Sequence, residues 1–150
     1  MNMPRQIVNR RSMLVYSALA TDRWKEAMSS NADMVMFDLE DGTAADRKDE
    51  GRVAVLPLYG AAPAATPLRL LRINSPRTLD GIRDLTAVCD SAVPPEGLVI
   101  PKVAHPEEVR WVADILDSAR VDSELIALIE CQNGVRRARD IALASNRLSA

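Results

Sequence analysis

The stretch Leu68-Arg69-Leu70-Leu71-Arg72-Ile73-Asn74 decides the fold, because a short apolar run ends there abruptly in polar residues. A second run of the same kind, 125–129, ends directly in Glu130. Short apolar runs rich in branched residues are typical of buried β-strands. An arginine and a carboxylate fixed at the carboxyl ends of such strands are typical of an α/β enzyme site.

The same pattern continues along the whole chain, where short apolar runs alternate with longer helical stretches. The predicted strands are 13–17, 34–37, 68–73, 98–100 and 125–129, and a sixth begins at 148–150. The predicted helices are 22–30, 45–58, 79–89, 106–118 and 135–144, with N-caps at Thr21 and Thr78 and a Pro/Ala linker at 61–67. Strict alternation of this kind predicts parallel strands covered by helices.

Two architectures satisfy this alternation, an open doubly wound sheet and a (β/α)8 TIM barrel, and both bind ligands at the carboxyl ends of the strands. A full barrel takes about 250 residues, so a chain of this length holds about five to six of its βα units. We predict a single partial TIM-barrel domain over residues 1–150, with strand–helix repeats from about residue 11. A complete small flavodoxin-like domain is a third alternative.

Composition excludes several classes of protein. The chain is 47% hydrophobic and 27% charged with a net charge of −2, as in ordinary globular proteins. Aromatic residues make up only 3% and no dense basic run is present, which argues against nucleic-acid binding. No run approaches the ~18–20 apolar residues of a membrane helix. Because Cys89 and Cys131 lack motif spacing, we expect reduced thiols and a cytoplasmic protein.

Three carboxylates follow the second predicted strand at once. Asp38 and Glu40 alternate with Leu39, so they share one side of an extended segment, and Asp41 comes next. Carboxylates this close repel one another unless a cation or a base offsets them. The cluster therefore predicts either part of a binding site or an exposed acidic turn that caps the next helix.

Arg72 and Asn74 are separated by one residue and therefore share a face of their strand. A guanidinium can bind a substrate carboxylate through two parallel hydrogen bonds. The alternative is a structural salt bridge from Arg72 to Asp38 or Asp41, because a buried arginine needs a partner.

Glu130 and Lys102 end two further strands. A carboxylate directly attached to a buried strand is costly unless it binds something, so Glu130 is a candidate ligand for Mg²⁺, with helix capping as the alternative. Lys102 follows Pro101 and is a candidate nucleophile, electrostatic aid or surface group. We expect His105, the only histidine, to be a cap or surface residue rather than a catalyst.

Taken in order, these residues resemble the citrate lyase beta-subunit family of the HpcH/HpaI aldolase type, which includes citryl-CoA and malyl-CoA lyases and thioesterases. The resemblance covers about residue 10 to the end of the chain. The matching segments are Arg11-Ser12-Met13-Leu14, Asn31-Ala32-Asp33, Asp38-Leu39-Glu40-Asp41, Lys48 with Arg52, Arg72-Ile73-Asn74, Pro101-Lys102-Val103, and Ile129-Glu130 with Gly134-Val135.

The resemblance implies a (β/α)8 barrel, of which this chain is the N-terminal part, and an Mg²⁺-dependent carbon–carbon lyase. The reaction it implies is aldol-type cleavage or condensation of a 3-hydroxyacyl thioester, or of a related oxo acid. Arg72 and Glu130 would bind the substrate, and Glu130 would also bind Mg²⁺, which acts as a Lewis acid on the keto or enolate oxygen. The residues implied to shape the site are Asp38, Glu40, Asp41, Asn74 and Lys102; no catalytic residue is assigned.

The chain also departs from the pattern of this family. Ser17-Ala18 replaces a Pro-Gly pair of the CoA-binding loop, and Cys131-Gln132 replaces a threonine. The family's second magnesium ligand follows the sixth strand, beyond Ala150, so we expect weak metal binding by this chain alone. Open strand edges predict a homo-oligomer or a complementary chain. The alternative function is that of a truncated, non-catalytic assembly or binding subunit.

Overall fold

The computed structural model describes residues 10–61 and 67–150, so most of the predicted linker at 61–67 lies outside the described residues. Five parallel strands form one sheet in the order β1-β2-β3-β4-β5. The strands are β1 (Met13–Ser17), β2 (Met34–Asp38), β3 (Leu68–Arg72), β4 (Gly97–Ile100) and β5 (Glu124–Ala127). The prediction of a parallel α/β fold is confirmed.

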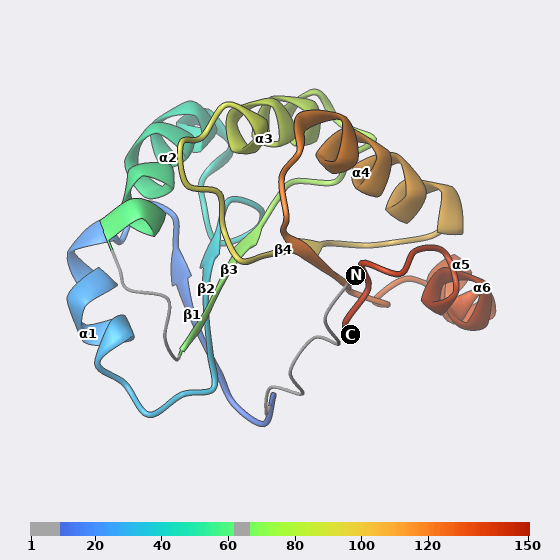
Figure 1. Ribbon diagram of the computed structural model, residues 1–150, viewed down its shortest axis with the longest axis horizontal. Helices are drawn as coiled ribbons and strands as arrows, with labels where there is room; N and C mark the ends of the chain where they lie inside the picture. Colours follow the sequence, from blue (N-terminus) through green and yellow to red (C-terminus); the bar gives the residue numbers. More distant parts are fainter. Residues whose placement is uncertain (1–9, 62–66) are drawn as a thin grey trace.

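The strand order separates the candidate architectures. Each strand pairs with its neighbour in sequence, and the order does not reverse at any point among the described strands. A doubly wound or flavodoxin-like sheet reverses its order at a switch point and carries helices on both faces. Here the helices follow one another in an arc along one side of the sheet (Figure 1). Both alternatives are therefore wrong for the described sheet.

The helices are mostly those predicted, with differences at their ends. They are α1 (Trp24–Met28), α2 (Lys48–Val55), α3 (Leu79–Cys89), α4 (Pro106–Ala119), α5 (Gln132–Arg136) and α6 (Ala138–Ala142), with 3₁₀ turns at Thr21–Arg23, Ala45–Arg47 and Leu56–Ala61. Thr78 caps α3 as predicted, because its Oγ1 accepts the Gly81 N–H at 3.0 Å. Thr21 is not a cap: the Arg23 N–H bonds to the Ala20 carbonyl at 3.0 Å, so the turn begins one residue earlier.

The main core lies between the sheet and the helices. Its strand residues alternate along each strand, with Val35 and Phe37 from β2 and Leu98 and Ile100 from β4 facing the helices. The few aromatic side chains gather here: the ring of Trp24 lies 5.4 Å from that of Phe37 and 5.5 Å from that of Tyr59. These contacts fasten α1 and the turn after α2 to the sheet.

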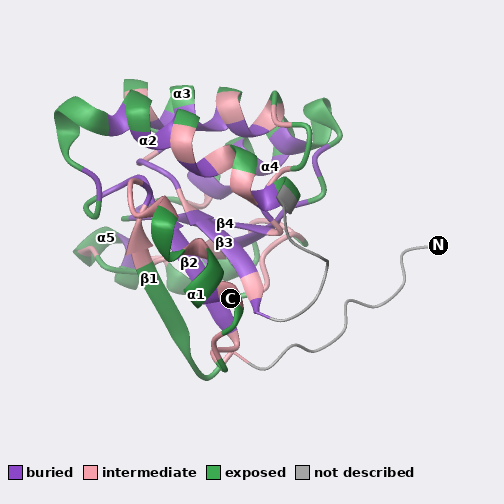
Figure 2. Cartoon of the chain, turned by 90° about the vertical axis from the view of Figure 1, so that its left-hand side faces the viewer, coloured by how far each residue is buried: buried purple, intermediate pink, exposed green. Residues whose placement is uncertain are grey.

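The opposite face of the sheet carries a second, smaller apolar cluster. It consists of Met34, Met36, Leu70 and Val99, with Leu68, Ile126 and Leu128 packed against it. At the edge, β1 leaves Met13 39% and Val15 50% exposed, and the register places them beside Met34 and Met36 (Figure 2). The open edge strand β1 therefore exposes apolar side chains.

The other edge of the sheet begins to extend beyond β5. Leu148 forms an isolated parallel bridge with Leu125, and the Leu125 N–H donates to the Arg147 carbonyl at 2.8 Å. The sixth strand predicted at 148–150 is present only as this bridge.

None of the helices in the described ranges combines the length and apolar character needed to cross a membrane.

Candidate active site at the carboxyl ends of the strands

The sheet register brings the polar ends of neighbouring strands to one edge. Ser17 of β1, Asp38 of β2 and Arg72 of β3 lie side by side in one row across the three strands. Lys102 follows β4, and Glu130 follows β5. Parallel strands all point the same way, so these side chains meet at a single mouth of the sheet.

Asp38 and Arg72 form the central ion pair of this mouth. Arg72 Nε donates to Asp38 Oδ1 at 2.8 Å, and Arg72 Nη2 donates to Asp38 Oδ2 at 2.6 Å. The Asp38 side chain is 2% exposed and that of Arg72 is 16% exposed. The hydrogen bonds that Arg72 donates to Asp38 raise the pKa of Arg72. The predicted salt bridge from Arg72 to Asp38 is thus present, and its two hydrogen bonds fix the orientation of the guanidinium.

The loop after β2 wraps around the Asp38 carboxylate. The backbone N–H of Glu40 donates to it at 2.8 Å and that of Gly42 at 2.6 Å, while Thr43 Oγ1 donates to the Asp38 carbonyl at 2.6 Å. A Cβ added to Gly42 would overlap Asp38 Oδ2, so glycine is required at this close approach. Because Asp38 and Glu40 are buried, the interpretation of an exposed acidic turn is wrong for both.

Lys102 neutralises the rest of the acidic loop. Its Nζ contacts Glu40 Oε1 and lies 3.1 Å from Asp41 Oδ2, and Glu40 Oε2 lies 3.2 Å from Arg72 Nη1. Hydrogen bonds to Glu40 and Asp41 raise the pKa of Lys102, and the bond from Lys102 lowers the pKa of Asp41. An amine held in its charged form is a poor nucleophile, which argues against the Schiff-base role.

Glu130 reaches the same mouth, but not in the way we predicted. Strand β5 ends at Ala127, so Glu130 is exposed rather than attached to a buried strand, and the burial argument for it was wrong. Its Oε1 accepts the backbone N–H of Lys102 at 2.9 Å. Helix capping is also excluded as its role, because Cys131 is the N-cap of α5 and its Sγ accepts the Gly134 N–H at 3.4 Å.

A buried polar network lies beneath the acidic loop, and of its members the sequence reasoning named Lys48, Arg52 and Asn74 but missed Asp84. Lys48 Nζ donates to the Leu39 carbonyl at 2.6 Å and also contacts the Glu40 carbonyl. Asn74 Nδ2 donates to the Leu39 carbonyl at 3.0 Å and to Asp84 Oδ2 at 2.7 Å. Asn74 therefore links the backbone of the acidic loop to Asp84 on α3.

Asp84 anchors this network to α3. It is fully buried, and its Oδ1 accepts from Arg52 Nη1 at 2.5 Å. The sequence carried a signal for it, because Asp84 lies on the same apolar face of the helix as Leu85 and Val88. A charged residue on a buried face needs a buried partner, and Arg52 on α2 provides it.

His105, in contrast, is exposed at the N-cap of α4, as expected.

Among the polar side chains at this mouth, one carboxylate, that of Glu130, is suited to bind Mg²⁺. Within residues 10–61 and 67–150, no group of three His, Cys, Asp or Glu side chains is placed to hold a metal ion. Glu130 is exposed, and only its Oε1 has a hydrogen-bond partner among these residues. Mg²⁺ is commonly bound by one or two carboxylates together with water and substrate oxygens. Glu130 is the residue of this mouth that could hold it.

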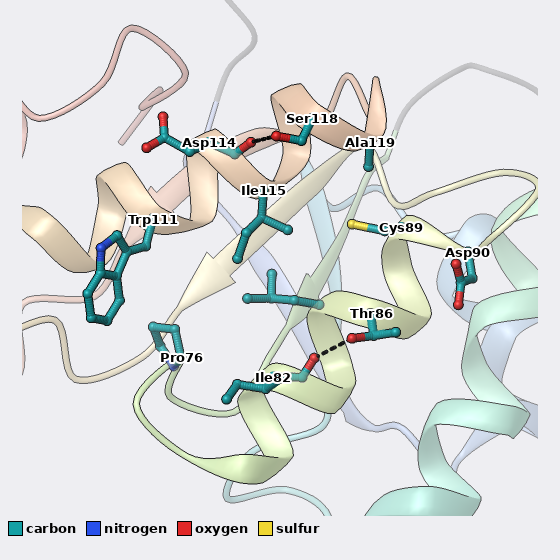
Figure 3. Close-up of a pocket in the computed structure, with 11 residues that line it drawn as sticks. Pro76, Ile82, Thr86, Cys89, Asp90, Trp111, Asp114, Ile115, Ser118 and Ala119 are labelled. Carbon is teal, nitrogen blue, oxygen red and sulfur yellow. Dashed lines mark hydrogen bonds between the residues drawn. The ribbon is translucent and has the colours of Figure 1, made fainter.

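A separate hollow of about 800 Å³ lies on the outer helical layer. Ile82 and Cys89 of α3 and Trp111 and Ile115 of α4 point toward one another across it (Figure 3). Its remaining lining residues are Pro76, Leu85, Thr86, Asp90, Asp114, Ser118 and Ala119. None of the charged residues at the strand ends lines it, so the hollow is distinct from the candidate site.

Comparison with known proteins agrees with this architecture. Residues 11–150 match the family described as HpcH/HpaI aldolase/citrate lyase. The chain belongs to this family. The resemblance inferred from the ordered motifs is confirmed, and the motifs with Asp38, Arg72, Lys102 and Glu130 lie at the mouth of the HpcH/HpaI sheet.

Relatives of this HpcH/HpaI chain include enzymes of related chemistry. Human mitochondrial citramalyl-CoA lyase is 32% identical over 107 residues, which are 71% of this chain and 32% of the human protein. A (3S)-malyl-CoA thioesterase of Cereibacter sphaeroides is 30% identical over 139 residues, covering 93% of this chain and 46% of that protein. The chain thus spans between about a third and a half of these curated relatives.

Solved structures extend the comparison to the fold. The citrate lyase beta subunit of M. tuberculosis, complexed with oxaloacetate and magnesium, superposes with a TM-score of 0.73 at 29% identity, over 93% of this chain and 56% of that one. Protein CitE of Mycobacterium tuberculosis, in complex with magnesium, acetoacetate and coenzyme A, matches at a TM-score of 0.72 and 29% identity, over 91% of this chain and 47% of that one.

Proposed function

We propose that this chain forms the substrate-binding part of a (β/α)8 barrel that cleaves or condenses 3-hydroxyacyl thioesters of the malyl-CoA or citryl-CoA kind. The observation that carries this proposal is the guanidinium of Arg72, fixed at a mouth that also holds Glu130. Strand order and the arc of helices support the barrel, of which residues 1–150 are one partial domain.

Arg72 is suited to bind a substrate carboxylate because its partners occupy only part of the guanidinium. Asp38 engages Nε and one N–H of Nη2, and Glu40 lies beside Nη1. Nη1 and Nη2 each carry a further N–H, and these two donors point from the end of the group as a parallel pair. Such a pair matches the two oxygens of a carboxylate. Asp38 therefore acts as the support that aims Arg72.

Glu130 is suited to hold Mg²⁺ next to that carboxylate. When bound, Mg²⁺ would polarise the substrate carbonyl and stabilise an enolate as a Lewis acid. The Lys102 N–H fixes one oxygen of Glu130, so the other oxygen is held ready for the cation. Complexes of relatives with magnesium and oxaloacetate or pyruvate support this assignment.

The net negative charge of the mouth also favours binding of an anionic substrate together with a divalent cation. The carboxylates are Asp38, Glu40, Asp41 and Glu130, whereas the cationic side chains that reach them are Arg72 and Lys102. An anionic substrate alone would meet this excess of negative charge, and a divalent cation offsets it. Asn74, through the Leu39 carbonyl, keeps the acidic loop in place.

One observation favours a second candidate function, that of an assembly or binding subunit. The edge strand β1 presents Met13 and Val15 to solvent beside an otherwise buried face. An exposed apolar edge is a template for pairing with a further strand. In either function we propose a homo-oligomer or a complementary chain as partner.

The free thiols of Cys89 and Cys131 support a reducing, cytoplasmic location.

The proposal is tested by binding and turnover with a panel of malyl, citramalyl and citryl thioesters. We expect calorimetry to show oxaloacetate binding that needs Mg²⁺, lost in Arg72→Ala and weakened at least about tenfold in Arg72→Lys, which keeps the charge but not the paired donors. Glu130→Gln should remove the Mg²⁺-dependent rise in melting temperature.

Arg110→Ala is the matched control, because Arg110 is half-exposed on α4 and pairs only with Glu107 among the described residues. Its oxaloacetate affinity should equal that of the wild type. Unchanged affinity in Arg72→Ala would refute the role of Arg72. Absence of turnover from a stable oligomer that still binds oxaloacetate would favour the assembly function.

A further inference from the structure

Lys102 has an unusual backbone. Its φ is 52°, and the only other non-glycine residue with positive φ in the described ranges is Arg120, with a φ of 58°. Arg120 is the C-cap of α4, where a left-handed residue is common. Lys102 follows a strand and ends no helix. A left-handed conformation is strained for a residue other than glycine and persists where surrounding contacts hold it.

This conformation lets one residue reach three parts of the mouth. The Lys102 N–H holds Glu130 at 2.9 Å. Its ammonium contacts Glu40 and lies 3.1 Å from Asp41. Lys102 thus contacts the carboxylates in two ways. Its backbone N–H binds Glu130, and its side-chain ammonium binds Glu40 and Asp41 of the acidic loop.

Without the ammonium, Glu40 and Asp41 would lose the cation that they share. Their carboxylate oxygens would then be open to a hard cation such as Mg²⁺ or Ca²⁺. The Glu40 side chain is 8% exposed, and its Oε2 makes no hydrogen bond among the described residues, having only the ion pair with Arg72 at 3.2 Å. A buried carboxylate with spare capacity would compete for the metal.

We propose that Lys102 is a tethered cation that keeps Glu40 and Asp41 from binding the divalent metal and so reserves the metal for Glu130. This inference rests on the proposed function, in which Glu130 is the metal ligand. Lys102 is then a specificity-determining residue: its charge confines the metal to one carboxylate and leaves the remaining coordination positions to water and substrate oxygens. Ca²⁺, which takes more oxygen ligands than Mg²⁺, is the cation most strongly excluded.

The test measures metal binding alone, by calorimetry with Mg²⁺ and Ca²⁺ and by the electron paramagnetic resonance signal of Mn²⁺. We expect Lys102→Met to lower the dissociation constant for Ca²⁺ at least about tenfold, because both loop carboxylates become available. Lys102→Arg keeps the charge and should bind metal as the wild type does. Lys102→Gly adopts the left-handed backbone without strain, so it should fold and behave like Lys102→Met.

Arg120→Met is the matched control, since it removes a positive charge from the other left-handed residue, which is exposed and lies at the C-terminus of α4. Its metal affinity should not change. An unchanged or weaker affinity for Ca²⁺ in both Lys102→Met and Lys102→Gly would overturn the proposal.

The outcome also separates this inference from the proposed function. If Glu130→Gln leaves Mg²⁺ binding unchanged in the wild-type background, the role of Glu130 fails. A gain of Ca²⁺ binding in Lys102→Met would, even then, support exclusion of metal by Lys102. If both variants behave as expected, Glu130→Gln should abolish metal binding in the wild type but not in Lys102→Met.

Discussion

Asp38 and Arg72 are direct partners across β2 and β3, and their side chains are joined by two hydrogen bonds of 2.8 and 2.6 Å. The pair is formed by strand register rather than by a loop, so the rigid sheet sets its geometry. The backbone N–H groups of Glu40 and Gly42 in the following loop donate to the same carboxylate, which anchors the loop. One buried carboxylate thus orients both the arginine and the acidic loop.

Removal of the Asp38 carboxylate should strongly destabilise the fold. Asp38→Ala leaves Arg72 without its main partner and two loop N–H groups without an acceptor, and we expect a loss of about 3 kcal/mol in the free energy of unfolding. Urea denaturation measures this value. Asp114→Ala, on the exposed face of α4, is the control and should change stability little. Equal midpoints for the two variants would contradict the anchoring role.

A methyl group at Gly42 should disturb the same anchor by steric overlap. Because the added Cβ of Gly42→Ala meets Asp38 Oδ2, the carboxylate must shift, and we expect a loss of about 1–3 kcal/mol with weaker oxaloacetate binding. Gly60→Ala is the matched control, because its nearest neighbour, Val93 Cγ2, lies 3.5 Å from the added atom, an ordinary contact. Thermal melting and calorimetry of both variants decide the point, and a Gly42→Ala protein as stable as Gly60→Ala would refute it.

The buried Asp84 should contribute more to stability than its exposed neighbour on the same helix. Asp84→Asn removes the one fully buried charge partner of Arg52 among the described residues and leaves it only the more exposed Asp49 and Asp80, so we expect a loss of about 3 kcal/mol. Asp80 also contacts Arg52, at 3.4 Å, but its side chain is 37% exposed. Asp80→Asn should therefore lose only about 0.3–1 kcal/mol. A similar loss in both variants, measured by chemical denaturation, would show that burial of Asp84 is unimportant.

The ion pair of Asp33 and Arg11 at the opposite end of β2 should add to stability only at higher pH. Hydrogen bonds from Arg11 lower the pKa of Asp33 from 3.8 to about 2. A carboxylate whose pKa is lower in the folded state stabilises fully above its unfolded pKa, and this contribution is lost as the pH falls from about 3.8 toward about 2. The difference in urea midpoint between wild type and Asp33→Asn should shrink over this range, and salt should reduce it. A difference that is independent of pH would contradict the assignment.

Local sequence predicted the elements well where chemistry along the chain decides them. Helix 79–89 and strand 13–17 have the predicted bounds, and Thr78 caps its helix through its own hydroxyl. The predicted helix 135–144 is instead broken at Arg137 into α5 and α6. Its apolar residues Val135 and Leu143 are exposed, so tertiary packing does not hold them on one continuous helix.

By itself, the sequence determined that this is a parallel α/β protein of the HpcH/HpaI family with polar residues at its strand ends, because hydrophobic periodicity and capping act over a few residues. Only the tertiary structure decided which charges meet. Asp38 binds Arg72 through strand register, Lys102 reaches Glu40 through a left-handed backbone, and Asp84 lies buried against Arg52. These pairings join residues distant in the chain, and their strength depends on burial, which no local pattern specifies.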